Sequence, residues 1–164
     1  MPPISLWLFF PLAITLHNLE EAIWLPKWSK NAKPFHKPVE EHEFYFAVLF
    51  VTILAYLFTF LAVAWPSSWL WTRIFYGFMG AMILNTFIPH LAATIMLRKY
   101  SPGLATGLCL LVPMNTVILH QSVVLGHINL LDLALSILVV SLTLLSLLPV
   151  FFKLGRRLAN QVTQ

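Results

Sequence analysis

The chain has few charged residues for its length. Only 10% of its 164 residues are Asp, Glu, Lys or Arg, whereas 59% are hydrophobic, and the mean hydropathy is +0.83. This composition excludes an ordinary water-soluble domain, in which about a quarter of the residues are charged. No long polar tract interrupts the sequence, so we expect a single integral membrane domain over residues 1–164.

Cysteine is nearly absent. Cys109, the one cysteine, lies within an apolar run, so the sequence excludes a framework of intramolecular disulfides. The net charge of +4 does not indicate a nucleic-acid partner. The basic residues of the chain stand in short groups between apolar runs, which is typical of topology signals in membrane proteins.

Apolar segments long enough to cross a bilayer make up most of the chain. A bilayer core needs roughly 20 helical residues, and polar or proline-containing breaks leave five such segments. They are Ile4–Leu25, Glu43–Trp65, Trp69–Leu97, Leu104–Leu125 and Leu130–Phe152. The expected fold class is therefore all-α, a polytopic membrane bundle of about five transmembrane helices. Gly77 and Gly80 would give the third helix a small face for close helix contact.

The basic residues predict the orientation of these helices. Nine of the ten would lie on one side of the membrane, and only Arg73 would lie on the other. The positive-inside rule then places the N-terminus outside and the C-terminus in the cytoplasm. The nine are Lys27, Lys30, Lys33, Lys37, Arg98, Lys99, Lys153, Arg156 and Arg157.

Ionisable side chains follow the first apolar run at membrane depth. The run from Ile4 to Leu16 spans only about 20 Å, so the helix must continue to cross a bilayer. Its continuation brings His17, Glu20 and Glu21 into the cytoplasmic third, on one helix face. These groups can bind zinc, iron or manganese, and one carboxylate can serve as a general base. Two alternatives stay open: a helix that ends early, with these residues at the water interface, and an intramembrane ion pair.

A second polar pair, Asn85 and His90, brackets Pro89 in the third helix. On a regular helix the two side chains would differ by about 140° and face different ways. Pro89 removes the hydrogen bond to the Asn85 carbonyl and favours a kink or local widening. We expect His90 to lie at the depth of Glu20 and to share its site. The alternative is a histidine that is merely hydrogen-bonded within the helix packing.

Acidic residues also open the second helix. Glu40, Glu41, His42 and Glu43 follow Pro38, an arrangement that ordinarily stabilises a helix N-terminus. His42 and Glu43 would lie deepest and are further candidate metal ligands.

Polar residues near the outer side have structural interpretations. Asn129 and Asp132 form a capping pattern at the start of the fifth helix. His127 lies in a short loop. The segment from Asn115 to His120 repeats the spacing of Asn85 and His90. We treat this repeat as chance, because antiparallel helices would place the two histidines at opposite depths.

Three motifs resemble those of the bacterial HXXEE membrane family. His17, Glu20 and Glu21 match the pattern in its name, Asn85 to His90 reads as NxxxxH, and Tyr100 to Gly103 reads as YxPG. The resemblance covers roughly residues 10 to 113 and implies a membrane enzyme without an established substrate, in the bacterial inner membrane. A weaker likeness is to intramembrane proteases of prenyl-protein processing, from which the chain departs in helix number and in lacking an arginine after the paired glutamates.

The expected function is a metal-dependent membrane enzyme acting on a lipid or other apolar small molecule. It would be a hydrolase or a di-metal oxidoreductase, with Glu20 and Glu21 as catalytic residues and Asn85 as a cofactor-binding residue. The metal would be zinc or iron. Its candidate ligands are His17, Glu20, Glu21, His42, Glu43 and His90. Two alternatives remain: a transporter or carrier of ions or metals, and a structural subunit of a membrane complex.

Overall fold

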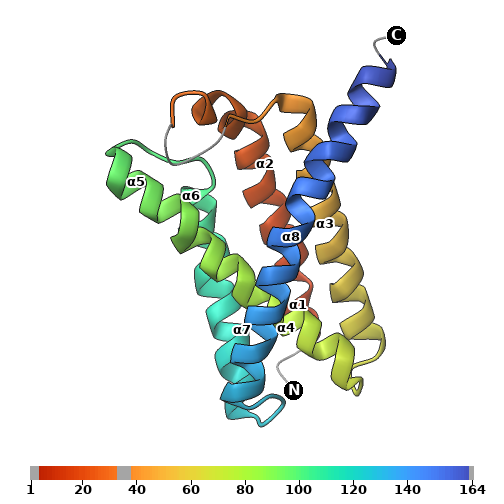
Figure 1. Ribbon diagram of the computed structural model, residues 1–164. Coiled ribbons are helices and arrows are strands. Elements are labelled where there is room, and N and C mark those ends of the chain that lie inside the picture. The colour runs from red at the N-terminus through yellow and green to blue at the C-terminus, as the bar shows by residue number, and fades with distance from the viewer. Residues whose placement is uncertain (1–3, 33–37, 163–164) are drawn as a thin grey trace.

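The computed structural model describes residues 4–32 and 38–162, and in these ranges all regular secondary structure is helical (Figure 1). Lys33 and Lys37, two of the predicted topology signals, lie outside the described residues. The all-α prediction is confirmed. The elements are α1 (Ile4–Trp7), α2 (Phe9–Ser29), α3 (Glu41–Ala64), α4 (Trp69–Asn85), the π-helical segment η1 (Thr86–Leu91), α5 (Ala92–Leu97), α6 (Leu104–Thr106), the π-helical segment η2 (Gly107–Leu111), α7 (Val112–Val124) and α8 (Leu130–Val162).

Four helical segments in the described part of the chain are long and apolar enough to cross a membrane. They are Glu41–Ala64, Trp69–Leu97, Leu104–Val124 and Leu130–Gln161. Their bounds follow the last four predicted spans closely, except that α8 continues well past Phe152. Helix α2 is not among them, because its polar string from His17 to Glu21 lowers its hydropathy. A spanning role for α2 therefore stays a prediction.

Helix ends carry recognisable capping residues. The Ser68 hydroxyl accepts a hydrogen bond from the Trp71 amide at the start of α4. At the start of α8, Asn129 Oδ1 accepts a 2.8 Å hydrogen bond from the Asp132 amide, which confirms the predicted cap. The Asp132 carboxylate also pairs with Arg73 of α4, and the Arg73 guanidinium lies 4.5 Å from the centre of the Trp69 ring.

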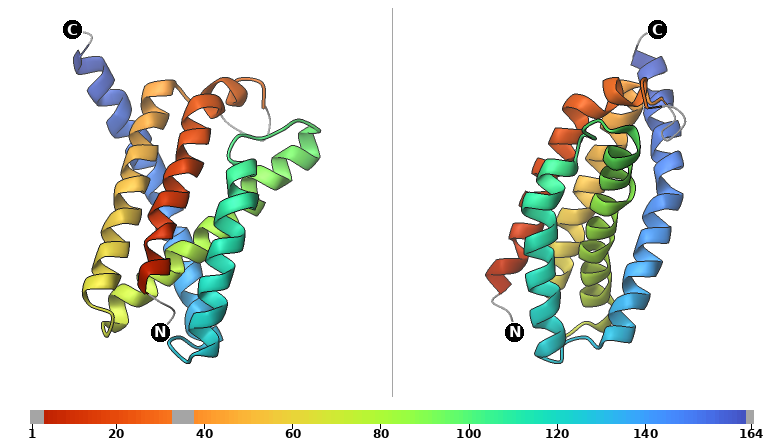
Figure 2. Two further views of the ribbon diagram at one scale, coloured as in Figure 1. Left: turned by 180° about the vertical axis from the view of Figure 1, so that it is seen from behind. Right: turned by 90° about the vertical axis from the view of Figure 1, so that its left-hand side faces the viewer.

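An aromatic cluster joins α1 and α2 to α4. Trp7 and Phe10 are nearly inaccessible to solvent, and their rings lie 5.1 to 5.8 Å from those of Phe75, Tyr76 and Phe78. Tilted and edge-on contacts of this kind add to the stabilisation from apolar burial. The cluster holds the start of α2 against α4, and α4 continues through η1 and α5 obliquely across the bundle (Figure 2).

Glycines let α4 and α8 approach closely. A Cβ at Gly77 would lie 2.5 Å from the Ser136 carbonyl oxygen, and one at Gly80 would lie 2.3 Å from Ile137 Cγ1. The predicted small face is thus confirmed, and α8 packs on it.

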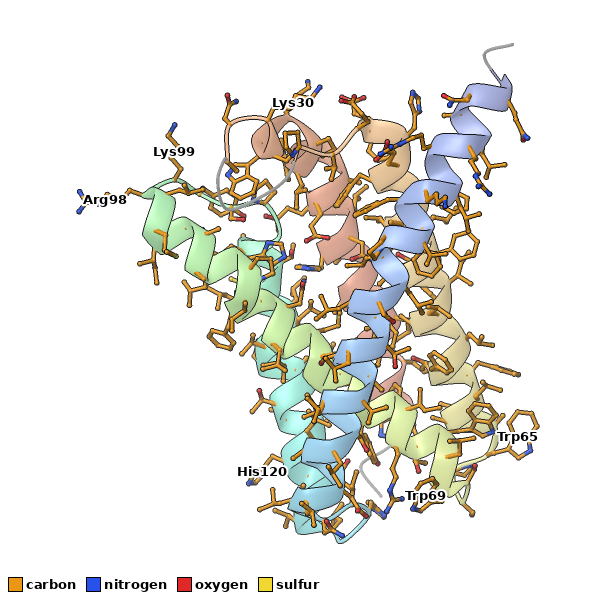
Figure 3. All side chains as sticks on the ribbon, in the orientation of Figure 1. Lys30, Trp65, Trp69, Arg98, Lys99 and His120 are labelled. Carbon is orange, nitrogen blue, oxygen red and sulfur yellow. The ribbon has the colours of Figure 1, made fainter. Side chains whose placement is uncertain are left out.

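Charged and aromatic residues mark the two ends of the bundle. Lys30, Arg98 and Lys99 lie at one end, and Trp65, Trp69 and His120 lie at the other (Figure 3). Lys30, Arg98 and Lys99 thus share one end of the bundle, and the side of the membrane on which that end lies stays a prediction.

Candidate metal centre

The helix that carries Asn85 and His90 is irregular where these residues lie. It widens into the π-helical segment η1 around Pro89, and Ile88 has an extended backbone conformation (φ −133°, ψ 105°). Asn85 Nδ2 consequently lies 3.1 Å from His90 Nε2, although the two residues would diverge on a regular helix. The predicted effect of Pro89 is confirmed.

Three ionisable side chains from α2 and η1 converge beside this irregularity. His90 Nε2 lies 2.8 Å from Glu21 Oε1, and His17 Nε2 lies 3.7 Å from the same oxygen. The imidazole centres are 5.4 Å apart, and one ligand atom from each of the three residues lies within 4.8 Å of the others. His17 and His90 are buried, whereas the Glu21 side chain keeps 12% of its surface exposed. We call His17, Glu21 and His90 the three-ligand cluster.

The donor set of this cluster fits a transition metal. Bonds of about 2.0–2.1 Å to a tetrahedral zinc ion would separate the ligand atoms by roughly 3.3 Å, which lies between the two distances to Glu21 Oε1. Two imidazole nitrogens and one carboxylate oxygen suit zinc or iron better than magnesium, which prefers oxygen ligands and retained water. Asn85 Nδ2 lies 3.3 Å from His17 Nε2 as well, so its amide lies against both imidazoles.

Glu20 lies outside the three-ligand cluster, although it was predicted as a ligand. Consecutive side chains on a helix diverge by about 100°, so Glu20 faces the turn before α6 while Glu21 faces η1. Its Oε1 accepts a 2.8 Å hydrogen bond from the Gly103 amide and another from the Tyr100 hydroxyl. Its Oε2 accepts bonds from the Thr106 amide at 3.0 Å and the Thr106 hydroxyl at 2.6 Å. Four donors therefore satisfy this carboxylate.

Tyr100 is a stable donor in this network. Burial, together with its hydrogen bond to Glu20, raises the pKa of Tyr100 above its ordinary value of 10.0. The hydroxyl therefore stays protonated at neutral pH and donates to Glu20.

Thr106 links the two halves of the site, and sequence reasoning missed it. Its hydroxyl donates to Glu20 Oε2 and lies 3.2 Å from His17 Nδ1. Because the hydroxyl proton points to Glu20, the oxygen accepts from His17, which assigns the proton to Nδ1. His17 Nε2 is then the acceptor nitrogen, which faces the Asn85 amide nitrogen at 3.3 Å and Glu21 Oε1 at 3.7 Å. The only sequence signal for Thr106 is its place in the first helical turn after the YxPG motif.

Gly103 allows the turn to lie directly against the cluster. Its φ of +92° is in the region that favours glycine. A Cβ there would lie 2.8 Å from His90 Cε1 and 3.0 Å from His17 Cε1. Gly103 of the YxPG motif thus brings the turn before α6 close to both imidazoles.

The structure does not bring His42 and Glu43 into the three-ligand cluster. His42 is exposed, and Glu43 Oε1 instead lies 2.5 Å from Arg156 Nε of α8. This ion pair fastens the start of α3 to the extended end of α8. A helix-start role for this acidic group is therefore the better interpretation.

The outer histidines are likewise separate from the cluster. His120 and His127 are exposed. Asn115 is buried and donates a 3.0 Å hydrogen bond to the Met79 carbonyl. Asn115 and His120 thus have different surroundings, unlike the convergent pair Asn85 and His90.

Comparison with known proteins gives a family but no assigned chemistry. The model of a family described as "Protein of unknown function with HXXEE motif" matches residues 7–118. The chain is also 47% identical over 151 residues to the uncharacterized protein YrkK of Bacillus subtilis (strain 168), an alignment that covers 92% of this chain and 96% of that protein. No solved structure matches the chain. With its three motifs gathered around one site and most of its length matched, this chain belongs to the HXXEE family.

Proposed function

We propose that the protein is a metal-dependent integral membrane enzyme in which His17, Glu21 and His90 hold one zinc or iron ion. The observation that carries this proposal is the convergence of three ligand atoms within 4.8 Å in a largely buried site. An isolated buried carboxylate is costly in an apolar bundle, and a bound cation would offset that cost.

Three protein ligands leave a coordination position open, as in catalytic rather than structural zinc sites. When bound, such an ion supplies an activated water or polarises a carbonyl or phosphoryl oxygen. The protein's own contribution is to orient the ligands. Glu20 and Thr106 fix the His17 tautomer, and Asn85 lies against both imidazoles.

A single ion favours hydrolysis over di-metal oxidation. Di-iron carboxylate centres in helical bundles use four carboxylates and two histidines. In the described part of the chain, the grouped ligands amount to one carboxylate and two imidazoles. Glu20, the nearest further carboxylate along the chain, is engaged by Gly103, Thr106 and Tyr100.

An apolar cavity beside His90 supports an apolar substrate. It has a volume of about 160 Å³, comparable to engineered cavities that bind benzene, and its polar lining consists of His90 and Ser101. Its apolar walls include Leu25, Trp28 and Ile88. We propose that α2 crosses the membrane with the other four spans, with the C-terminus in the cytoplasm, so that this cavity opens toward lipid.

Elemental analysis of gently purified protein tests the metal proposal. We expect about one equivalent of zinc or iron per chain, lost in His17→Ala, Glu21→Gln and His90→Ala variants and retained in a His127→Ala control. A content below about a tenth of an equivalent, with no gain on reconstitution, would overturn it. A proton-transfer pair of Glu21 and His90 would then be the better proposal, because these groups already lie 2.8 Å apart.

One observation favours the transport alternative. The helix that carries His90 is discontinuous at Ile88, and transporters often bind ions at such breaks. Uptake of zinc into sealed proteoliposomes would distinguish the two. An enzyme is expected to bind the ion without moving it across the membrane, whereas accumulation abolished by His90→Ala would favour transport.

A further inference from the structure

A second, larger groove runs along α2 and shares Trp28 with the cavity beside His90. Its volume is about 730 Å³, within the range of small-molecule sites. Leu16, Leu19, Ile23 and Trp24 form one wall. Pro102, Ala105 and Leu110 belong to the opposite wall. Both walls are thus apolar.

Few polar groups line this groove, and they belong to the network described above. Glu20, Tyr100 and Thr106 contribute to the lining. The Thr106 hydroxyl is in turn 3.2 Å from His17 Nδ1. A ligand in the groove would therefore lie one hydrogen-bonded residue away from the three-ligand cluster.

The length of the groove matches the apolar part of one membrane leaflet. Leu16 and Trp28 both line it, and twelve residues of α-helix separate them by about 18 Å. Half of a bilayer core is roughly 15 Å thick. Trp24 and Trp28 lie toward one end, where amphipathic aromatic rings favour the membrane interface, and the Tyr100 hydroxyl reaches Glu20 between the two ends.

Exposed basic residues stand next to the aromatic residues of the groove along the chain. Lys27 is exposed one helical turn from Trp24, and Arg98 and Lys99 are exposed just before Tyr100. Arg98 and Lys99 lie at the same end of the bundle as Lys30 (Figure 3). The charge at this end is complementary to an anionic head group.

We propose that the groove binds one hydrocarbon chain of an anionic phospholipid, with the phosphate beside Lys27 and Lys99. The chain lies along α2 from Trp28 toward Leu16, and the head group stays at the aromatic end. This inference rests on the proposed function in naming an anionic lipid as the substrate class, whereas the binding itself is measurable without any reaction.

Native mass spectrometry of the detergent-purified chain tests this binding. The probes are phosphatidylglycerol and phosphatidylcholine with identical acyl chains. The wild-type chain is expected to retain phosphatidylglycerol in preference to phosphatidylcholine. Ala105→Trp, which fills the groove, should reduce retained phosphatidylglycerol about tenfold, whereas Ala134→Trp, at an exposed alanine of α8, should not.

A second variant changes only exposed charges. Lys27→Ala with Lys99→Ala should weaken phosphatidylglycerol binding about fivefold for each lysine and leave phosphatidylcholine binding unchanged. Equal retention of the two lipids by the wild-type chain, or equal retention by the two tryptophan variants, would overturn the groove proposal.

Metal content measured on the same samples separates the two proposals. His90→Ala should lose metal and keep its preference for phosphatidylglycerol. Lipid preference without metal in any sample would support the groove and overturn the metal centre. Metal without lipid preference would support the metal centre and overturn the groove.

Discussion

Glu20 and Glu21 are neighbours in the chain, yet Glu21 Oε1 lies 2.8 Å from His90 Nε2 while Glu20 Oε1 accepts a 2.8 Å hydrogen bond from the Gly103 amide. One carboxylate therefore belongs to the three-ligand cluster and the other holds the turn that packs against it. This division of roles makes the pair separable by mutation.

Glu21→Gln should affect metal binding, whereas Glu20→Gln should affect stability. Glu21→Gln removes a ligand, so metal content should fall while the melting temperature of the metal-free protein changes little. Glu20→Gln removes the charge that accepts four hydrogen bonds and should lower the free energy of unfolding by about 1.5–3 kcal/mol. Elemental analysis and thermal melting in detergent measure the two effects. Identical behaviour of the two variants would contradict separate roles.

Thr106→Val should weaken metal binding without removing a ligand. Valine keeps the shape of the side chain but leaves His17 Nδ1 and Glu20 Oε2 without the hydroxyl between them. We expect a loss of affinity of about 10–100-fold, the usual effect of removing a group that orients a ligand. Thr106→Ser should restore most of it, and Ser122→Ala, which removes a buried hydroxyl bonded to the Ile118 carbonyl, is the matched control. A serine variant as weak as the valine variant would argue against orientation by the hydroxyl.

Gly103→Ala should lower the free energy of unfolding by more than the backbone strain of a positive φ explains. Gly126 also has a positive φ, of +74°, but a Cβ there would meet nothing within 4 Å. Gly126→Ala therefore measures the backbone strain, about 1–2 kcal/mol. Gly103→Ala adds contacts with both imidazoles and should cost roughly 1–3 kcal/mol more, with reduced metal content. Thermal melting of both variants measures the difference. Equal losses of stability would show that the imidazoles move away from the added methyl group at no cost.

Metal binding should weaken as pH falls. The binding forms are neutral imidazoles and an ionised carboxylate, so protons compete with the metal for the same lone pairs. With two histidine ligands, affinity should fall by up to about two log units per pH unit. Tyr100→Phe should keep this slope, because the raised pKa of Tyr100 leaves its hydroxyl protonated throughout this range. Metal affinity independent of pH between 5 and 7 would contradict histidine ligation.

Reporter fusions test the membrane topology. A reporter after Gln164 is expected to be cytoplasmic, and one inserted at Pro66 to Ser68 is expected to be external, because nine of the ten basic residues would then face the cytoplasm. An external C-terminus would end the five-span proposal.

The amino-acid sequence by itself determined the helical class and the approximate bounds of four apolar spans, except the end of the last one, and it predicted that His17, Glu21 and His90 share one site. Hydropathy and helical spacing are local properties, so these features can be read along the chain. Pro89 even indicated the widening that brings Asn85 beside His90, since proline removes a specific backbone hydrogen bond.

Only the tertiary structure decided which polar groups meet. The pairing of Glu43 with Arg156 and the bonds of Glu20 to Gly103 and Thr106 join residues more than 80 positions apart. No helical period encodes such contacts, because they depend on how α2, α3 and α8 pack and on the turn at Gly103. The packing of the helices thus separated the six candidate ligands into a cluster of three and three residues with other partners or surroundings.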